Sequence, residues 1–303
     1  MKYFITLISI LSSLFSFSNA VDFALLTDIG SSAQSIALGN IEGYSAGSDA
    51  VFSNPANLSK TSGYSMSVFS TTFMEEINYY NLSMSGKTPF GTVGIGIYES
   101  SVTNLPKTKR RNDSSQTIYT DSYFDFKNST LKLSYQTQLS PKTSIGASYS
   151  YYSINFEKYR GEGINFDVGL VHSTHLYSLS VFTQNLLPHS HVSYSNGKSE
   201  ALPFYISSTL MYPYRAFQFI PQLKYGQENL LLSCGILYTP PFFAFMDLLM
   251  GYKQQLDYTS KRHQKLTFGV SLRLVDIDIH YAYERSDYFL TDHHNYISFN
   301  YNL

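Results

Sequence analysis

Apolar and polar residues alternate along most of this chain, and this pattern limits the folds that the chain can adopt. Leu131, Leu133 and Tyr135 alternate with Lys132 and Ser134. The same pattern recurs in segments 64–68, 145–151 and 277–284. Because successive side chains of a β-strand point to opposite faces, a period of two residues indicates strands with one apolar and one polar face. The pattern therefore predicts an all-β fold.

Two classes of β-fold fit this alternation: a soluble sandwich that buries its apolar face, and a membrane barrel that turns it to lipid. The alternating segments often run to about ten residues or more, whereas most strands of soluble proteins have about five or six. Many of them place tyrosines near their ends, where membrane barrels carry aromatic girdles. The chain holds 27 Tyr and 22 Phe but no Trp. We favour the transmembrane antiparallel barrel.

The apolar runs of the chain indicate how it could enter a membrane. No run after residue 20 approaches the ~20 apolar residues of a membrane-spanning helix. The strongest candidate, residues 240–249, is interrupted by Asp247. Only helices and closed barrels pair all their backbone groups inside a bilayer, so a secreted chain of this kind can enter a membrane only as a barrel.

Residues 1–20 have the features of a cleaved signal peptide. Lys2 supplies a positive start, residues 3–17 form an apolar run, and Ser18-Asn19-Ala20 offers a cleavage site of the small-x-small type. An uncleaved membrane anchor is the alternative, although the apolar run is short for one. We expect the mature chain to reside in the cell outer membrane, in contact with its lipids.

The remaining segments predict a barrel of roughly fourteen strands over residues 63–303, an even number as in single-chain bacterial barrels. Short polar turns such as Ser140-Pro141-Lys142 contrast with 104–125 and 188–202, which are predicted to be long outer loops. The strands are expected to begin near Tyr64, Glu76, Gly91, Phe126, Thr143, Gly163, Leu176, Pro203, Arg215, Asn229, Phe242, Gln264, Asp276 and His293.

Residues 21–62 differ from the rest because they are rich in Gly, Ser, Ala and Asn and lack a clear strand pattern. Ile36, Leu38 and Ile41 could belong to one short element. The sequence Asn54-Pro55-Ala56-Asn57-Leu58 predicts a turn that leads into a short helix. A segment too small to fold alone should pack inside or beneath the barrel, so we predict an N-terminal plug.

Several motifs occur here in an order that is found in a known family. They lie at 30–40, 48–58, 89–96, 165–170, 184–186 and 200–203. Together they resemble PorV/PorQ-type outer-membrane proteins, which belong to the FadL-like superfamily of hydrophobic-compound transporters. The family pattern ends in Asn-Pro-Ala-Gly-Leu, whereas this chain has Asn57 at the glycine position. The second glycine pair of the pattern is also loosened, with Ala37 and Leu38 before Gly39.

The resemblance implies a fourteen-stranded barrel with an internal N-terminal hatch that carries the Asn-Pro-Ala turn. It implies a conduit or binding site for hydrophobic small molecules. The alternative is a PorV-like adaptor of type IX secretion that binds secreted proteins. The candidate plug or gating motif is Asn54, Pro55, Ala56, Gly30, Gly39 and Asp49. An ordinary structural turn that anchors the plug is the alternative role for Asn-Pro-Ala.

Other features argue against further function classes. The formal charge of −1 with only 14% charged residues does not suggest nucleic-acid binding. The single cysteine, Cys234, excludes an internal disulfide framework. Asp287, Asp292, His293 and His294 cluster around one connection, but no Gly-x-Ser-x-Gly motif accompanies them, so we expect no enzyme and no cofactor.

The histidines and one basic run complete the candidate sites. His172 and His175 should face opposite sides of a strand, and His189 and His191 have no third ligand near in sequence, so no metal site is expected. The basic residues Lys107, Lys109, Arg110 and Arg111 fall in the predicted loop 104–125. They could contact anionic lipid headgroups, but a solvated loop is favoured.

The last residues predict how the barrel assembles. Phe299, Tyr301 and Leu303 lie on one face of the final strand and should meet lipid, whereas Asn300 and Asn302 should face the lumen. We expect this strand to pair with the first one, so that no open edge remains. The pattern resembles the C-terminal signal that the barrel assembly machinery reads, although that signal more often ends in phenylalanine.

Overall fold

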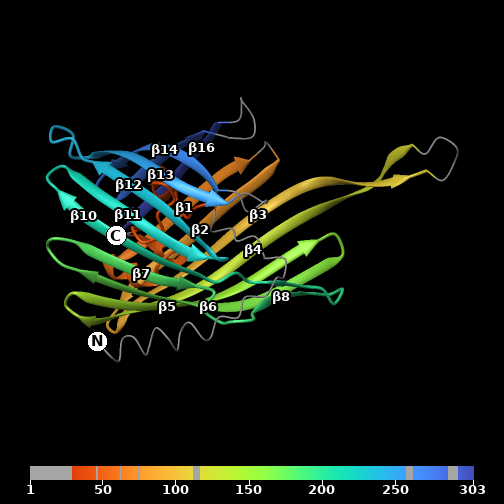
Figure 1. Cartoon of the computed structure of the whole chain (residues 1–303), viewed down its shortest axis with the longest axis horizontal. Coiled ribbons are helices and arrows are strands. Elements are labelled where there is room, and N and C mark those ends of the chain that lie inside the picture. Colours follow the sequence, from red (N-terminus) through yellow and green to blue (C-terminus); the bar gives the residue numbers. More distant parts are fainter. Residues whose placement is uncertain are drawn as a thin grey trace.

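The computed structural model describes residues 29–45, 47–61, 63–73, 76–111, 117–256, 262–285 and 293–303. Fourteen strands form a closed antiparallel barrel, seen from the side in Figure 1. Each strand pairs with the next one along the chain, except that β7 pairs with β10. The barrel closes between β1 and β16, where Met66 lies opposite Tyr301. The predicted fold class is confirmed, and the sandwich alternative is wrong.

The bounds of the strands agree well with the sequence prediction. Five strands begin at the expected residue, and eight others begin within four residues of it. The barrel strands are β1 (Tyr64–Phe73), β2 (Ile77–Thr88), β3 (Gly91–Arg110), β4 (Ile118–Ser140), β5 (Thr143–Phe156), β6 (Tyr159–Ser173), β7 (Ser178–Gln184), β10 (Tyr205–Tyr214), β11 (Phe217–Gly226), β12 (Asn229–Tyr238), β13 (Met246–Leu256), β14 (Arg262–Arg273), β15 (Ile277–Arg285) and β16 (His293–Asn302).

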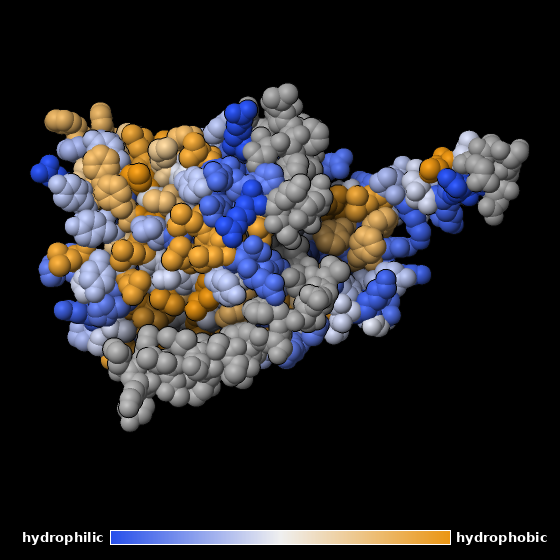
Figure 2. All heavy atoms as spheres, in the orientation of Figure 1, coloured by the Kyte–Doolittle hydropathy of each residue, from blue (hydrophilic) through white to orange (hydrophobic). Residues whose placement is uncertain are grey.

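The two faces of the barrel wall have opposite character. On β4, Lys132 is 1% exposed and Ser134 is buried, whereas Leu133 and Tyr135 are 46% and 44% exposed. Figure 2 shows apolar residues over much of the outer surface of the barrel. Monomeric soluble proteins rarely expose large continuous apolar patches. An apolar outside with a polar inside is the pattern of membrane barrels.

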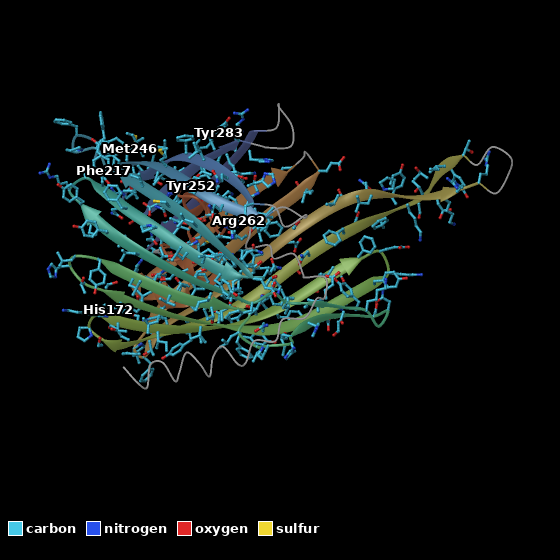
Figure 3. All side chains as sticks on the ribbon, in the orientation of Figure 1. His172, Phe217, Met246, Tyr252, Arg262 and Tyr283 are labelled. Atoms are coloured by element: carbon cyan, nitrogen blue, oxygen red, sulfur yellow. The ribbon has the colours of Figure 1, made fainter. Side chains whose placement is uncertain are left out.

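Both ends of the barrel can be followed in Figure 3. Phe217 and Met246 begin their strands at the end where short turns lie, and His172 lies there near the end of β6. Tyr283 and Arg262 lie towards the opposite end. The carboxyl-terminal Leu303 exchanges backbone hydrogen bonds with Tyr64, the first residue of β1.

The described part of the N-terminal segment forms three short helices: α2 (Ala33–Ala37), η2 (Ser48–Phe52) and η3 (Pro55–Lys60). Helix α2 packs against β13 to β16, η2 against β1 to β4, and η3 against β3 to β6. Most of their residues are buried, and Figure 1 shows this segment, in red and orange, enclosed by the strands. No described helix is long and apolar enough to cross a membrane.

The predicted loop 104–125 is wrong for most of its length. Residues up to Arg110 continue β3 and residues from Ile118 belong to β4, so the two strands form a long arm that extends beyond the barrel (Figure 1). Ladder pairing continues after an irregularity, and Lys109 forms an ion pair of 2.8 Å with Asp121 across the strands. Cross-strand pairs of this kind stabilise a ladder even where no core lies beneath it. Three of the four basic residues predicted to lie in a loop therefore belong to a strand.

The second predicted loop, 188–202, also contains regular structure. Strands β8 (His191–Tyr194) and β9 (Ser199–Ala201) form a small hairpin outside the main ladder. Strand β8 pairs with Gly161 and Glu162 of β6. The sequence 195–198 contains the turn, and Gly197 has a positive φ of 82° there.

We predict that deleting residues 301–303 prevents assembly of the barrel. The backbone N–H of Leu303 donates to Tyr64 O at 2.8 Å, and Tyr64 N–H donates to Leu303 O at 3.0 Å. Without residues 301–303 the first residues of β1, Tyr64 to Met66, lose their partners on β16. Asn302→Ala is the matched control, since it keeps the backbone bonds and leaves Phe299, Tyr301 and Leu303 in place. We expect heat-modifiable gel mobility and outer-membrane yield to be lost for the deletion only; a normal yield of the deleted chain would contradict closure through this pair.

Candidate functional site

Glycines of the barrel wall mark where the N-terminal segment lies against it. A Cβ atom on Gly146 of β5 would come within 2.5 Å of Ala56 N, and one on Gly169 of β6 would lie 1.8 Å from Asn54 Oδ1. Real Cβ atoms do not approach other atoms so closely. Comparable contacts with the segment would occur at Gly94, Gly96, Gly235, Gly251 and Gly269. The wall is therefore recessed where the segment packs.

The Asn-Pro-Ala turn is docked between three strands. Asn54 caps η3, because its Oδ1 accepts a hydrogen bond of 2.9 Å from Ala56 N–H. Its Nδ2 donates to Ser180 Oγ of β7 at 2.8 Å. Pro55 occupies the first turn of η3, where its missing N–H costs nothing. The turn thus fixes the start of η3 against β5, β6 and β7.

Asn57, which departs from the family pattern, has a clear structural role. Its side chain is fully buried, and Nδ2 donates to Gly43 O at 2.9 Å. Gly43 itself leaves no room for a side chain beside Thr209. Asn57 therefore connects η3 to the preceding loop of the N-terminal segment, a contact that glycine could not make.

Gly30 and Gly39 lie on either side of α2, away from the Asn-Pro-Ala turn. Their φ values of 123° and 87° lie in the region that L side chains rarely adopt. A Cβ atom on Gly39 would also come within 2.5 Å of Tyr252 O in β13, a strand residue labelled in Figure 3. These two glycines position α2 and do not join the turn in one cluster.

Asp49 lies in η2 as a buried carboxylate. It accepts a hydrogen bond from Ser45 Oγ, and burial raises the pKa of this carboxyl above its ordinary value. Lys60 at the end of η3 has an exposed side chain, but desolvation of its ammonium by the surrounding residues lowers its pKa to about 8. Lys60 Nζ donates to Tyr44 O at 3.3 Å. Hydrogen bonds of these two ionisable side chains thus stabilise the loop between α2 and η3.

A row of aromatic side chains lies on the inner face of the wall. We call it the aromatic arc; it consists of Tyr296 of β16, Phe69 of β1, Tyr79 of β2, Tyr98 of β3 and Tyr152 of β5, all buried. The ring centroids of Phe69 lie 6.1 Å from Tyr296 and 5.5 Å from Tyr79. Those of Tyr79 and Tyr98 are 6.5 Å apart. The arc gives one side of a largely polar lumen an aromatic lining.

The hydroxyl groups of the arc are tied to its surroundings. Tyr79 OH donates to Gly30 O at 3.1 Å and Tyr98 OH donates to Phe52 O at 3.1 Å. Tyr152 OH donates to Asn185 Oδ1 at 2.6 Å. Buried tyrosines usually pair their hydroxyl in this way. The arc therefore contacts the N-terminal segment and ends beside Asn185.

At Asn185 the wall loses its regular ladder. Strand β7 ends at Gln184, and its ladder with β6 covers only Val168–Ser173. We call residues 163–167 of β6 the β6 edge, because they pair with neither β7 nor β8 in the ladder. Asn185 has a positive φ of 58°, and the backbone N–H of the next residue, Leu186, donates to Phe166 O of the β6 edge at 2.7 Å.

Side chains replace part of the missing ladder at the β6 edge. Asp167 Oδ1 accepts a hydrogen bond from Asn185 N–H at 2.9 Å, and its Oδ2 lies 2.5 Å from Lys132 Nζ of β4. Both ionised groups are 1% exposed. Asn165 Oδ1 accepts from Leu187 N–H at 2.9 Å. A buried carboxylate is costly without a partner, so Lys132 holds Asp167 in place to receive the chain after β7.

Sequence reasoning noticed these residues without placing them together. The motifs 165–170, 184–186 and 200–203 meet at the β6 edge, where Asn185 Nδ2 donates to Pro203 O at 2.9 Å. The aromatic arc was missed, because tyrosines were assigned to girdles at the strand ends. The alternation of side chains along the strand was the available signal. Tyr98 lies an even number of residues from Gly94 and Gly96, so it shares their lumen-facing side of β3.

The barrel architecture is shared with solved structures. The closed fourteen-stranded antiparallel barrel with very little helix resembles known outer-membrane barrels in fold. The solved structures that the fold resembles include the toluene transporter TodX of Pseudomonas putida, with 16% identity, a TM-score of 0.64, and 90% of this chain and 99% of that chain covered. The toluene transporter TbuX of Ralstonia pickettii matches with 12% identity, a TM-score of 0.61, and coverage of 94% and 99%.

A Pseudomonas aeruginosa FadL homologue is a third structure with this fold. It matches with 9% identity and a TM-score of 0.55, and 89% of this chain and 98% of that chain are covered. At such low identities the matches show the shared fold. No family model and no curated protein matches the chain.

We predict that Gly169→Ala destabilises the protein by about 1–3 kcal/mol, the usual cost of overpacking. The added methyl would meet Asn54 Oδ1 at 1.8 Å. Asn54→Ala should by itself cost about 1 kcal/mol through loss of the helix cap. If the Cβ atom at position 169 meets the Asn54 side chain, the double variant loses less free energy of unfolding than the two single variants together. Denaturant unfolding in detergent measures this; strict additivity would contradict the docking of the turn against β6.

We predict that the stability contribution of Asp49 falls as the pH rises. Because its pKa is raised in the folded protein, the contribution is present below the ordinary carboxyl pKa and is lost as the pH rises through the raised value. Asp49→Asn should therefore gain stability over the wild type between pH 4 and about pH 7, a range below the pKa of Lys60. Ser45→Ala, which removes a hydrogen bond that lowers this pKa, should shift the loss to higher pH. Melting temperatures in detergent across this range test the sign.

Proposed function

We propose that this protein is an outer-membrane conduit for hydrophobic small molecules, with the N-terminal segment as its plug. The observation that carries the proposal is the aromatic arc. Four of its rings, on β16 and β1 to β3, form one buried cluster with the N-terminal segment, and its fifth ring, Tyr152, lies in a second cluster beside Asn185 at the β6 edge. Sites for small apolar ligands are lined mainly by aromatic and apolar side chains with a few fixed polar groups.

Buried ion pairs occupy other positions on the inner wall, which supports this path. Lys224 Nζ lies 3.0 Å from Glu42 Oε1, and Lys253 and Lys265 lie 2.6 and 3.0 Å from the carboxylate of Glu284. Apolar molecules gain nothing from displacing water around such ion pairs. An apolar ligand should therefore follow the aromatic arc.

The solved structures support the substrate class. TodX and TbuX are described as toluene transporters, and CymD, another barrel of this fold, as a monoaromatic hydrocarbon channel. We transfer from them the handling of a hydrophobic small molecule and a function without enzymatic chemistry. Aromatic rings in the lumen are compatible with such ligands, because ring pairs add attraction beyond the burial of apolar area.

The proposed location follows from the outer surface. Exposed Leu133, Tyr135 and Phe268 belong to an apolar band that a bilayer would cover. We propose that a signal peptide at residues 1–20, which lie outside the described residues, directs the chain to the outer membrane. The barrel assembly machinery and outer-membrane lipids are then its expected partners.

A PorV-like adaptor of type IX secretion is the second candidate function. The arm formed by β3 and β4 favours it, because the arm extends beyond the barrel and exposes Ile118 and Tyr123. Three matched barrels are described as transporters or channels, which adds no support for an adaptor. Co-purification in mild detergent separates the two functions: an adaptor should bring stoichiometric protein partners, and a conduit should bring lipid or hydrophobic ligand.

We predict that Asn54→Ala and Pro55→Ala lower uptake of toluene several-fold while the barrel still assembles. The turn would lose the contacts that hold it beside β6 and β7, at about 1 kcal/mol for the cap of Asn54. Uptake into proteoliposomes measures transport, and heat-modifiable gel mobility measures assembly. Asn196→Ala is the matched control, since Asn196 serves the turn of the outer β8–β9 hairpin. If mobility and uptake are lost together, the turn is structural and its gating role is wrong.

A further inference from the structure

One aromatic ring of the N-terminal segment lies against the aromatic arc. Phe52 is the last residue of η2 and is 2% exposed. Its ring centroid lies 4.0 Å from that of Tyr98, the closest of the described ring pairs, with the planes tilted by 38°. The N-terminal segment thus inserts one ring at the middle of the arc.

The wall is shaped to receive this ring. A Cβ atom on Gly96 would come within 2.5 Å of Cε1 and Cζ of Phe52, so glycine at this position makes the space. Tyr98 OH donates to the backbone carbonyl of Phe52 at 3.1 Å. The ring position is therefore bounded by the recess at Gly96 and the ring of Tyr98.

We propose that the position of the Phe52 ring is a binding site for a monocyclic aromatic ligand, which Phe52 fills as an internal substitute. This proposal rests on the proposed function and names its ligand class and its site. A small aromatic molecule would regain the contacts with Tyr98 that Phe52 makes. Exchange of one ring for another costs little, because the same kind of contact is lost and formed.

Phe52 is also close in sequence to the Asn-Pro-Ala turn of the proposed plug. Phe52 is followed by Ser53 and then by Asn54, which is hydrogen-bonded to Ser180 of β7 and packed against Gly169 of β6. Gly169 is two residues from Asp167, which receives the chain at the β6 edge. Release of the Phe52 ring would therefore remove a contact two residues before the docked Asn-Pro-Ala turn, leaving the hydrogen bond from Tyr98 OH to Phe52 O as the remaining link to Tyr98.

The first test removes the Phe52 ring, which in this proposal competes with the ligand for the site. Toluene binding to the purified full chain in detergent is measured by calorimetry for the wild type and for Phe52→Ala. We expect Phe52→Ala to bind toluene roughly three- to tenfold more tightly, since the site no longer holds its own ring. Tyr98→Ala should bind more weakly. Phe245→Ala, which removes an exposed ring in the β12–β13 turn, should leave the affinity unchanged.

The second test follows the ring itself. The chain contains no tryptophan, so Phe52→Trp introduces a single reporter. We expect toluene to shift its emission to longer wavelength and to increase its quenching by acrylamide. Leu237→Trp, on wall strand β12 outside the aromatic arc, is the control and should show no gain in quenching.

The outcomes separate this inference from the proposed function. Ring exchange is overturned if Phe52→Ala binds toluene with the affinity of the wild type. It is also overturned if toluene binds to Phe52→Trp without exposing the tryptophan. Neither result contradicts the proposed conduit function. Equal affinity of Phe52→Ala for toluene and methylcyclohexane overturns the aromatic ligand class. If neither the wild type nor Phe52→Ala binds either compound, the proposed function fails together with the inference.

Discussion

Closure of the backbone ladder between β1 and β16 is the constraint on which the rest of the structure depends. A closed ladder pairs its backbone groups within the wall, so the outer side chains can be apolar without exposing polar backbone to lipid. The inner face then has to be polar or filled. Serines, Lys132 and Asp167 make it polar, and the N-terminal segment fills part of it where glycines such as Gly169 leave room.

This filling leaves ion pairs and aromatic rings at different positions on the inner wall. Buried ion pairs join Lys132 to Asp167, Lys224 to Glu42, and Lys253 and Lys265 to Glu284, whereas the aromatic arc consists of rings on β16, β1, β2, β3 and β5. Ion pairs need each other to offset the cost of leaving water, which fixes their geometry. The aromatic rings have no such requirement, and for this reason the proposed exchange of an apolar molecule for a ring is placed at the arc.

The sequence predicts the wall better than its interior, and the reason is physical. Alternation is local, so the starts of β1, β3 and β5 can be predicted from a few residues each. The arm of β3 and β4 was mistaken for a loop because its charged residues show no apolar face, yet cross-strand pairs suffice there. The contact of Asn54 with Gly169 joins residues that are far apart along the chain, and no local pattern contains it.

The contacts of the N-terminal segment with the wall bear on its proposed role as a plug. Its hydrogen bonds to the wall are mainly neutral: Asn81 Nδ2 donates to Ser31 O at 2.7 Å and Thr267 Oγ1 donates to Ala37 O at 2.9 Å. Each such bond contributes only about 0.5–1.5 kcal/mol net, because water can replace the partner. The wall itself is joined by backbone ladders between neighbouring strands. Since the N-terminal segment is held by separable contacts, the proposed exchange of a ligand for the Phe52 ring would remove one of the contacts of η2 while the barrel around it stays closed.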